Sequence, residues 1–309
     1  MTEKNEMYDV IIVGGGGAGL AAALYASRGN LKTALFEKMV AGGQISTTDI
    51  VENYPGFPDA IAGPDISMKM EEQAKKYGTE IFYKEVTAIE PSPGNIMVRA
   101  GEDTFTTRSL ILASGANPRK LQVPGEAEFA ARGVSYCATC DGAFFRNKEI
   151  AVVGGGDSAI QEALFLTKFA SKVTIIHRRD ELRASKILQQ RAFDNDKVEF
   201  IWNAVIKEIK GAQKIATLIL EDTKTKETKE FGVEGLFVFI GHDPISSFVN
   251  NIVTCDDHGY VIAGENYQTN IAGIFACGEV RKGATRQLVS ACGEGCSAAL
   301  AAQDYLDNV

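Results

Sequence analysis

The chain has 309 residues, of which 45% are hydrophobic and 23% are charged, and its formal net charge is −8. This composition is typical of a globular protein of about two domains, and the acidic balance argues against nucleic acid and acidic membrane surfaces as partners. Six cysteines are too few for a disulfide-stapled secreted chain of this length. With no signal peptide and no long apolar run, the sequence predicts a cytoplasmic protein without a membrane span.

The first predicted unit is a strand, a glycine-rich loop and a helix. Residues 8–13 form an apolar, β-branched run typical of a buried parallel strand, and residues 14–19 follow as G-x-G-x-x-G before a helix over 20–27. The three glycines would permit a tight turn, close approach of the backbone to a pyrophosphate, and close packing of helix on strand. The next strand, 32–36, ends at Glu37, and a carboxylate at this point suits a free ribose hydroxyl. The pattern indicates a dinucleotide-binding unit.

A second glycine-rich loop and several strands complete the first part of the chain. Gly42, Gly43 and Gln44 form either an ordinary turn or a stretch of backbone that closely approaches a flat cofactor ring. Pro64 is expected to open a helix that runs to about residue 77. Further strands are expected at 80–88, 95–100, 103–107 and 110–113, with a linker at 117–119.

The motif Cys137-Ala138-Thr139-Cys140, followed by Asp141, lies near the middle of the chain. C-x-x-C is either a disulfide that opens to a reactive dithiol or half of a zinc site. The sequence has no second C-x-x-C, and its three histidines form no H-x-x-x-H pair. Because the motif lies between two nucleotide fingerprints, it indicates a redox-active pair that relays electrons. The adjacent Asp141 is expected to carry protons for the thiols, with a helix or turn cap as the alternative.

The strand, loop and helix recur after this motif. Residues 148–153 repeat the strand, 154–159 repeat the loop as G-x-G-x-x-A, and a helix is expected over 160–169. The sequence therefore indicates an internal duplication of a nucleotide-binding unit.

The two copies differ in charge at the end of their second strand. Where the first copy has Glu37, the second has His177, Arg178 and Arg179, with Arg183 close behind. Paired guanidiniums bind a 2′-phosphate bidentately, whereas an acid accepts a hydrogen bond from a free 2′-hydroxyl. The first site is therefore predicted to favour FAD and the second NADPH, with a solvated basic turn as the alternative reading of the arginines.

The C-terminal part returns to the first unit. Residues 274–279 are an apolar strand that ends in glycine and glutamate, and an alanine-rich helix is expected from Arg286 to Tyr305. This junction suits the ribityl chain of a flavin, or it is an ordinary strand-to-helix connection. Cys292 and Cys296 share a helix face, and we expect them to pack as small hydrophobic residues rather than bind a metal. Strands are also expected at 198–202, 204–210, 215–220 and 236–240, with a solvated hairpin tip at 223–229.

These motifs, in this order, resemble those of the low-molecular-weight thioredoxin reductases. The C-x-x-C-D sequence and its place inside the second nucleotide unit are the specific parts, and the resemblance covers the whole chain. It implies an α/β fold with two Rossmann-like three-layer nucleotide-binding domains, the second inserted into the first. The FAD domain would comprise residues 1–117 and 245–309, and the NADPH domain would comprise residues 118–244. It also implies a homodimer.

The same resemblance implies a set of site residues. Cys137, Cys140 and Asp141 would be catalytic, with Cys140 facing the flavin and Cys137 attacking the disulfide of thioredoxin; no metal is expected. The residues implied for FAD are Gly14, Gly16, Ala18, Gly19, Glu37, Lys38, Gly42, Gly43, Gln44, Asn53, Gly115, Gly278, Glu279, Arg286, Gln287 and Leu288. The residues implied for NADPH are Gly154, Gly156, Asp157, Ser158, Ala159, His177, Arg178, Arg179 and Arg183.

The implied activity is thioredoxin-disulfide reduction, with electrons passing from NADPH through FAD and the cysteine pair to thioredoxin or a thioredoxin-like protein. Nicotinamide and dithiol belong to the same domain and need the same flavin face, so the family rotates that domain between half-reactions. Asn117-Pro118 and residues 241–244 are the expected hinges. The alternative is a related flavoprotein with a ferredoxin-like donor or another thioredoxin-fold acceptor. A ferredoxin or quinone reductase would not need the cysteine pair, and a redox sensor would not need the arginines.

Three positions depart from the family pattern. Glu279 stands where the family usually has aspartate, and Ser114 stands where it commonly has threonine. The small residues 283–285 precede Arg286, where the family often has a bulky aromatic side chain. Glu279 would bring one extra methylene to the ribityl contact, and Ser114 keeps the hydroxyl group. The small residues 283–285 predict altered surroundings for the flavin.

Overall fold

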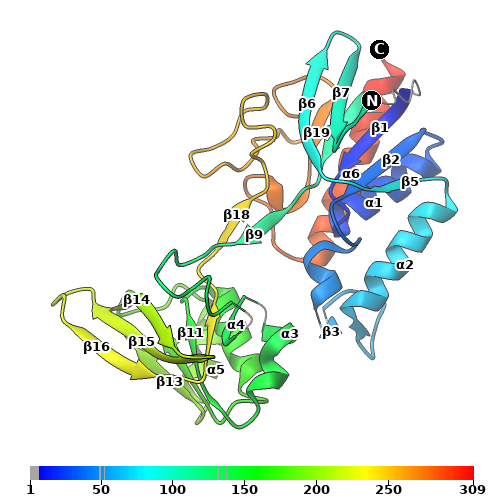
Figure 1. Ribbon diagram of the computed structural model, residues 1–309. Helices are drawn as coiled ribbons and strands as arrows, with labels where there is room; N and C mark the ends of the chain where they lie inside the picture. The colour runs from blue at the N-terminus through cyan, green and yellow to red at the C-terminus, as the bar shows by residue number, and fades with distance from the viewer. Residues whose placement is uncertain (1–6, 49, 52, 131, 137) are drawn as a thin grey trace. The chain divides into compact units, whose positions relative to one another are not determined.

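The computed structural model of the protein describes residues 7–48, 50–51, 53–130, 132–136 and 138–309, with the side chains of Thr139 and Cys140 outside that description. The chain divides into two compact units (Figure 1). Unit 1 comprises residues up to Asn117 and from Asp243 to Val309, and unit 2 comprises Pro118–His242. The second boundary lies two residues before the predicted one. The two crossings between units are β9 (Ala116–Pro118) and β18 (His242–Pro244), which pair as a two-stranded sheet.

Unit 1 is built on a seven-stranded sheet in the order β5-β2-β1-β8-β7-β6, with β19 also paired to β8. The strands β5, β2, β1, β8 and β19 are parallel, whereas β7 and β6 add an antiparallel meander. The strands are β1 (Met7–Val13), β2 (Thr33–Glu37), β5 (Glu80–Tyr83), β6 (Val86–Ser92), β7 (Asn95–Ala100), β8 (Asp103–Leu112) and β19 (Ile274–Ala276). The short strands β3 (Ile50–Val51) and β4 (Ile61–Ala62) pair with each other.

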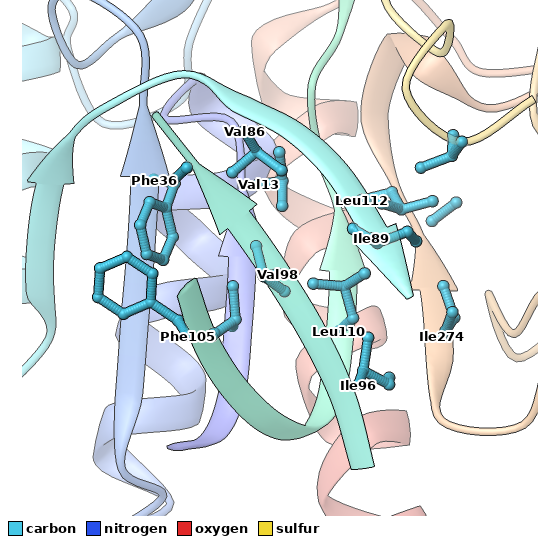
Figure 2. Packing of buried hydrophobic residues seen from close by; sticks show 14 of the residues in the cluster. Val13, Phe36, Val86, Ile89, Ile96, Val98, Phe105, Leu110, Leu112 and Ile274 are labelled. Atoms are coloured by element: carbon cyan, nitrogen blue, oxygen red, sulfur yellow. The ribbon is translucent and has the colours of Figure 1, made fainter. Parts of the chain in front are cut away.

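Alternating side chains of the parallel strands serve two cores. In β1, Val10 and Ile12 pack with the helices α1 (Gly17–Arg28) and α6 (Leu288–Asp307). Ile11 and Val13 point to the opposite face and pack with the β6–β7 meander. This period of two is expected for strands that are buried on both faces. Figure 2 shows the second core, where Val13, Phe36, Leu110 and Leu112 lie beside Ile89, Ile96 and Val98 of the meander. Helix α2 (Gly63–Lys76) packs against α1.

Two predictions of strand boundaries are wrong. The expected strands 103–107 and 110–113 form a single ten-residue strand, β8, because the polar residues between them are paired inside the sheet. Thr107 and Ser109 are fully buried, and their hydroxyl groups donate to the carbonyls of Ser109 and Gly273 at 2.8 and 3.1 Å. The expected strand 80–88 instead divides into β5 and β6.

Unit 2 repeats the same plan at smaller size. Its five-stranded sheet, β10-β17-β11-β12-β13, is entirely parallel. One face packs with α4 and α5, and the other face packs with the antiparallel sheet β14-β15-β16. The strands are β10 (Val134–Ser135), β11 (Glu149–Val153), β12 (Lys172–Ile176), β13 (Val198–Ile201), β14 (Ala204–Gly211), β15 (Ile215–Asp222), β16 (Thr228–Gly232) and β17 (Gly235–Val238). The helices are α3 (Ala138–Asp141), α4 (Asp157–Leu166) and α5 (Lys186–Phe193).

The α/β class with parallel sheets in both units confirms the predicted fold class. Among the helices that the structure describes, none is long and apolar enough to cross a membrane.

Candidate functional site

The first glycine loop joins β1 to α1 and leaves part of its backbone uncovered. A Cβ atom at Gly19 would lie 1.8 Å from the carbonyl oxygen of Gly14, so helix and strand approach too closely for any side chain there. At Gly16 the nearest atom to an added Cβ is the Cα of Gly43, 4.0 Å away. Gly19 therefore serves packing, whereas Gly16 keeps open backbone at the start of a 12-residue helix, where unpaired N–H groups favour a phosphate.

Glu37 lies directly beside this loop, at the end of β2. Its Oε2 accepts a hydrogen bond from the Gly15 N–H at 2.8 Å, and its Oε1 accepts from the Met39 N–H at 3.1 Å. Each carboxylate oxygen retains a further acceptor position, which suits a pair of ribose hydroxyls. Lys38, predicted to bind the same nucleotide, forms an exposed ion pair with Glu85 at 2.8 Å.

The second glycine loop contacts the first. The N–H of Gly42 donates to the Gly15 carbonyl at 2.7 Å, and an added Cβ at Gly43 would lie 3.1 Å from the Cα of Gly16. Gln44 begins the connection to the C-terminal segment. Its amide nitrogen donates to the carbonyl of Ala116 at 3.0 Å and to the Glu279 carboxylate at 3.4 Å.

The C-terminal segment brings the remaining predicted FAD residues to the same place. Asn53 donates to the side-chain oxygen of Gln287 at 2.8 Å, and Leu288 packs against Gly17 of the fingerprint. Burial raises the pKa of Glu279, and the positive charge of Arg286 opposes that shift. At Gly115, which precedes β9, no atom lies within 4 Å of an added Cβ.

The residues of unit 1 thus fit a dinucleotide with an unphosphorylated ribose. Two glycine loops, an acid at the end of β2 and the turn at 278–280 come from four separate parts of the chain and meet around Gly16. The carboxyl ends of parallel strands are where such folds bind ligands.

The glycine loop of unit 2 has the same geometry. A Cβ at Gly154 would lie 2.3 Å from the Phe239 carbonyl oxygen, whereas no atom lies within 4 Å of an added Cβ at Gly156. Asp157, at the start of α4, accepts from the Ser185 N–H at 2.5 Å. The N–H of Arg183 donates to the Gly155 carbonyl at 2.7 Å, so the basic segment folds back onto the loop.

The basic segment of unit 2 separates a buried histidine from exposed arginines. His177 is only 5% exposed and lies beneath Gly155, whose added Cβ would meet the imidazole ring at 2.3 Å. Burial, with the positive charges of the neighbouring arginines, lowers the pKa of His177 and favours the neutral ring. Arg178, Arg179 and Arg183 are exposed, and they form no ion pair with any residue that the structure describes. Three uncompensated guanidiniums beside an open glycine loop fit a nucleotide with an additional phosphate.

The cysteine motif lies on and before the short helix α3. Cys137 falls outside the described residues, and for Cys140 only the helical backbone is described. Asp141 is half-buried and makes no capping hydrogen bond to the turn Gly142–Phe145 that follows, which weakens its reading as a cap. Close contact of Gly142 with Leu166 and Phe169 joins this segment to α4.

Sequence reasoning missed a buried carboxylate next to the motif. Glu126 is 4% exposed and accepts hydrogen bonds from the N–H groups of Leu121 and Gln122, at 2.7 and 2.6 Å, and from the Tyr136 hydroxyl at 2.7 Å. Burial and this carboxylate raise the pKa of Tyr136. Tyr136 immediately precedes Cys137 in the chain. In the sequence, Glu126 is marked only as an acid between apolar residues, and this pattern does not reveal which groups donate to it.

The other four cysteines are free thiols. Cys277 is fully buried, while Cys292 and Cys296 line a groove of about 420 Å³ with Tyr25, Tyr54, Met70 and Val289. Burial raises the pKa of Cys292, so this thiol packs rather than reacts at neutral pH. No cluster of three metal-ligating side chains occurs in the described ranges.

Comparison with known proteins gives a consistent result over the full chain. Residues 8–295 match the family model described as pyridine nucleotide-disulphide oxidoreductase. A thioredoxin reductase of Bacillus subtilis is 48% identical over 307 residues, which cover 99% of this chain and 97% of the relative. The crystal structure of Lactococcus lactis thioredoxin reductase is 48% identical, covers 98% of this chain and 100% of its own, and has a TM-score of 0.92. A ferredoxin-flavin thioredoxin reductase from Clostridium acetobutylicum is 26% identical, covers 98% of both chains, and has a TM-score of 0.55.

Proposed function

Since the chain belongs to the pyridine nucleotide-disulphide oxidoreductase family, we propose that it is an NADPH-dependent thioredoxin-disulfide reductase that carries electrons through FAD and the Cys137–Cys140 pair. The resemblance found in the motifs is confirmed at the level of the family, and the similarity to thioredoxin reductases extends over nearly the whole chain. One observation supports NADPH as the electron donor. Three exposed arginines beside Gly156 form no ion pair with any residue that the structure describes.

FAD is proposed for unit 1. Its pyrophosphate would lie against the open backbone at Gly16, and its adenosine ribose would donate to Glu37. The ribityl chain would reach Glu279, whose link to Gln44 holds the carboxylate at this site. When bound, FAD supplies a carrier that accepts a hydride from a nicotinamide and returns two electrons to a disulfide.

NADPH is proposed for unit 2. Its pyrophosphate would lie at Gly156 and the start of α4, and its 2′-phosphate would be bound by Arg178, Arg179 and Arg183. His177 is buried below the loop, and we propose that it supports the loop rather than contacting the phosphate.

The cysteine pair and Asp141 would carry out the disulfide exchange. Cys137, as the thiolate, would attack one sulfur of the thioredoxin disulfide and form a mixed disulfide, and Cys140 would then displace reduced thioredoxin. Asp141 would deliver the proton that the departing thiolate needs, because it is the nearest titratable side chain in the sequence. The pair is left as a disulfide and must be reduced again by two electrons.

A rotation of unit 2 between half-reactions would turn on the two crossings. β9 and β18 pair with each other, and the Arg119 N–H donates to the Gly241 carbonyl at 2.8 Å. Two neighbouring segments that carry Pro118 and Gly241 are suitable hinges.

A homodimer is proposed with unit 1 at the interface. Tyr25 and Val289 line the groove between α1, α2 and α6 and are 39% and 46% exposed, and Met68 and Leu300 add exposed apolar surface on the same helices. A second copy of this chain would cover that surface. Sedimentation of the holoprotein should give a mass of two chains, and a monomer would refute this part. A cytoplasmic location is also proposed.

The alternative is a donor other than NADPH, such as a ferredoxin, or a different thioredoxin-fold acceptor. The chain is 48% identical to the thioredoxin reductases of Bacillus subtilis and Lactococcus lactis but only 26% identical to the ferredoxin-flavin enzyme. The retained arginines also favour NADPH, because a ferredoxin-linked enzyme has no 2′-phosphate to bind.

Anaerobic titration of the oxidised holoprotein with NADPH and with NADH, followed by flavin absorbance, tests the proposal. Bleaching by NADPH at a far lower concentration than by NADH is expected. Subsequent addition of oxidised thioredoxin should restore the absorbance. If neither nucleotide bleaches the flavin, NADPH is not the donor, and a reduced ferredoxin should be tried in the same assay.

A further inference from the structure

An ion pair between buried Glu294 and half-buried Arg281 lies behind the Gly278–Val280 turn. Glu294, in the second turn of α6, is 7% exposed, and its Oε1 accepts from Arg281 Nη2 at 2.6 Å while its Oε2 accepts from Arg281 Nε at 3.2 Å. The Arg281 guanidinium also lies over the ring of Tyr267, 5.3 Å from its centroid. Neither charged residue belongs to the predicted site.

The pair closes the turn from within the protein. Glu294 Oε2 also accepts from the Gly278 N–H at 2.8 Å, and the Arg281 N–H donates to the Gly278 carbonyl at 3.0 Å. Gly278 has φ +71, a conformation that other residues rarely adopt. The turn that carries Glu279 is thus fixed at both of its ends by two side chains and one backbone hydrogen bond.

Helix α6, which carries Glu294, also fixes the turn against the first glycine loop. An added Cβ at Gly295 would lie 2.0 Å from the Ala18 carbonyl oxygen, so α6 crosses α1 in direct backbone contact. An added Cβ at Gly278 would lie 2.9 Å from the Cβ of Ala18. Ala18 therefore touches both the turn and the helix that holds it, and Glu294 stands next to Gly295.

Stability alone is a poor reason for this arrangement. Removing two charges from water offsets most of their mutual attraction, so a buried pair of this kind often contributes no more than apolar residues of the same size. What the pair does provide is direction, because a bidentate carboxylate fixes its donors in one plane.

We propose that Glu294, paired with Arg281, is a positioning residue for the flavin nucleotide: it holds the Gly278–Glu279 turn against Ala18. The Glu279 carboxylate, which reaches Gln44, then stays in register with the fingerprint backbone at Gly16. The inference rests on the proposed function, because it requires FAD in unit 1.

Rebinding of FAD to the apoprotein tests this role without catalysis. We would remove the flavin and measure the Kd for FAD by quenching of flavin fluorescence in the wild type, E294Q, E294A and R281M. The matched control is E90Q, since Glu90 pairs with Arg99 at the same 2.6 Å but is exposed on the β6–β7 meander.

We expect E294A and R281M to raise the Kd for FAD by roughly tenfold or more. E294A leaves the Gly278 N–H and the Arg281 guanidinium without their acceptor, and R281M leaves the buried Glu294 carboxylate without its charged donor. E294Q should lie between these and the wild type, since its amide oxygen still accepts from the Gly278 N–H. E90Q should leave the Kd unchanged. Partial rescue by the isosteric glutamine is the signature of positioning. Because E294Q preserves shape, it decides the matter if E294A does not fold.

A Kd for E294Q within twofold of the wild type would overturn the inference. The inference would also be overturned if E294Q and E90Q both bound FAD more weakly and, in both variants, the loss of affinity followed a lower urea midpoint of the apoprotein. A wild-type apoprotein that does not rebind FAD at all would refute the proposed function itself, and the inference with it.

Discussion

Removing Arg178 and Arg179 together should remove most of the distinction between NADPH and NADH. Both guanidiniums are exposed and uncompensated by any described acid, and they lie on the segment that folds back onto Gly155. A 2′-phosphate carries nearly two negative charges at neutral pH, and without these two side chains only Arg183 of the three proposed guanidiniums would remain to bind it.

The magnitude follows from the exposure of the two side chains. A hydrogen bond to a charged group contributes about 1.5 kcal/mol at the lower end of its range, which is appropriate where solvent screens the pair. Two such contacts amount to about 3 kcal/mol, on the order of a 100-fold loss of affinity for the phosphorylated nucleotide. The affinity for the unphosphorylated nucleotide should not change.

The only tryptophan of the chain offers a direct assay. The Trp202 ring lies 6.4 Å from the His177 ring, centroid to centroid, so its fluorescence should respond to a nucleotide at the basic segment. Titration of R178Q/R179Q with NADP⁺, NAD⁺ and 2′,5′-ADP measures binding without reducing the flavin. R191Q is the control, because it removes an exposed positive charge from α5 of the same unit.

Two results would refute this reasoning. One is an equal loss of affinity for NADP⁺ and NAD⁺, which would mean that the arginines support the loop rather than bind the phosphate. The other is a preference for NADP⁺ that is as large in the double variant as in the wild type. A further check is ionic strength, since the preference of the wild type should fall as salt screens the exposed charges.

Three other predictions concern a glycine loop, the cysteine pair and His177. Gly16→Val should abolish FAD binding while leaving the urea midpoint of the apoprotein unchanged. Gly19→Val should prevent folding, because its Cβ would lie 1.8 Å from a carbonyl oxygen. Equal effects of the two substitutions on folding would contradict this prediction. Cys140→Ser should still be bleached by NADPH but lose thioredoxin turnover, and loss of both would count against the assignment. Because burial lowers the pKa of His177, the unfolded chain binds the extra proton as pH falls below about 6.5 and stability is lost. The free energy of unfolding, measured in urea between pH 7 and 5, should therefore fall with pH in the wild type. His177→Gln should reduce that fall by up to about 1.4 kcal/mol per pH unit.

The parts of the fold that could be predicted depend on local pattern. The run 8–13 is apolar at every position but one, which is what a strand buried on both faces requires, and the structure divides it between two cores. The glycine spacing also carries its own geometry, since Gly19 fits only if helix and strand nearly touch. These features need no knowledge of distant residues.

The parts that could not be predicted depend on contacts between distant segments. The sequence predicts a break between strands at residues 108–109, yet the hydroxyl groups of Thr107 and Ser109 donate to carbonyls inside the sheet. Likewise, Glu294 lies in an alanine-rich helix, and nothing in the helical pattern shows that it accepts from Gly278 and Arg281. A buried polar group is stable only with its partner, and the partner is set by tertiary packing.

The two nucleotide loops show how a single position can determine the charge of a site. The residue at the end of the second strand lies beneath the glycine that follows the first glycine of each motif. Glu37, the last residue of β2, accepts from the Gly15 N–H, whereas the ring of His177, which directly follows β12, fills the space below Gly155. An acid at position 177 would pair with the neighbouring arginines and repel a phosphate. A buried, neutral imidazole does neither, so the guanidiniums remain available at the surface. The proposed preference for FAD in one unit and NADPH in the other therefore depends on the side chain beneath the loop as much as on the arginines themselves.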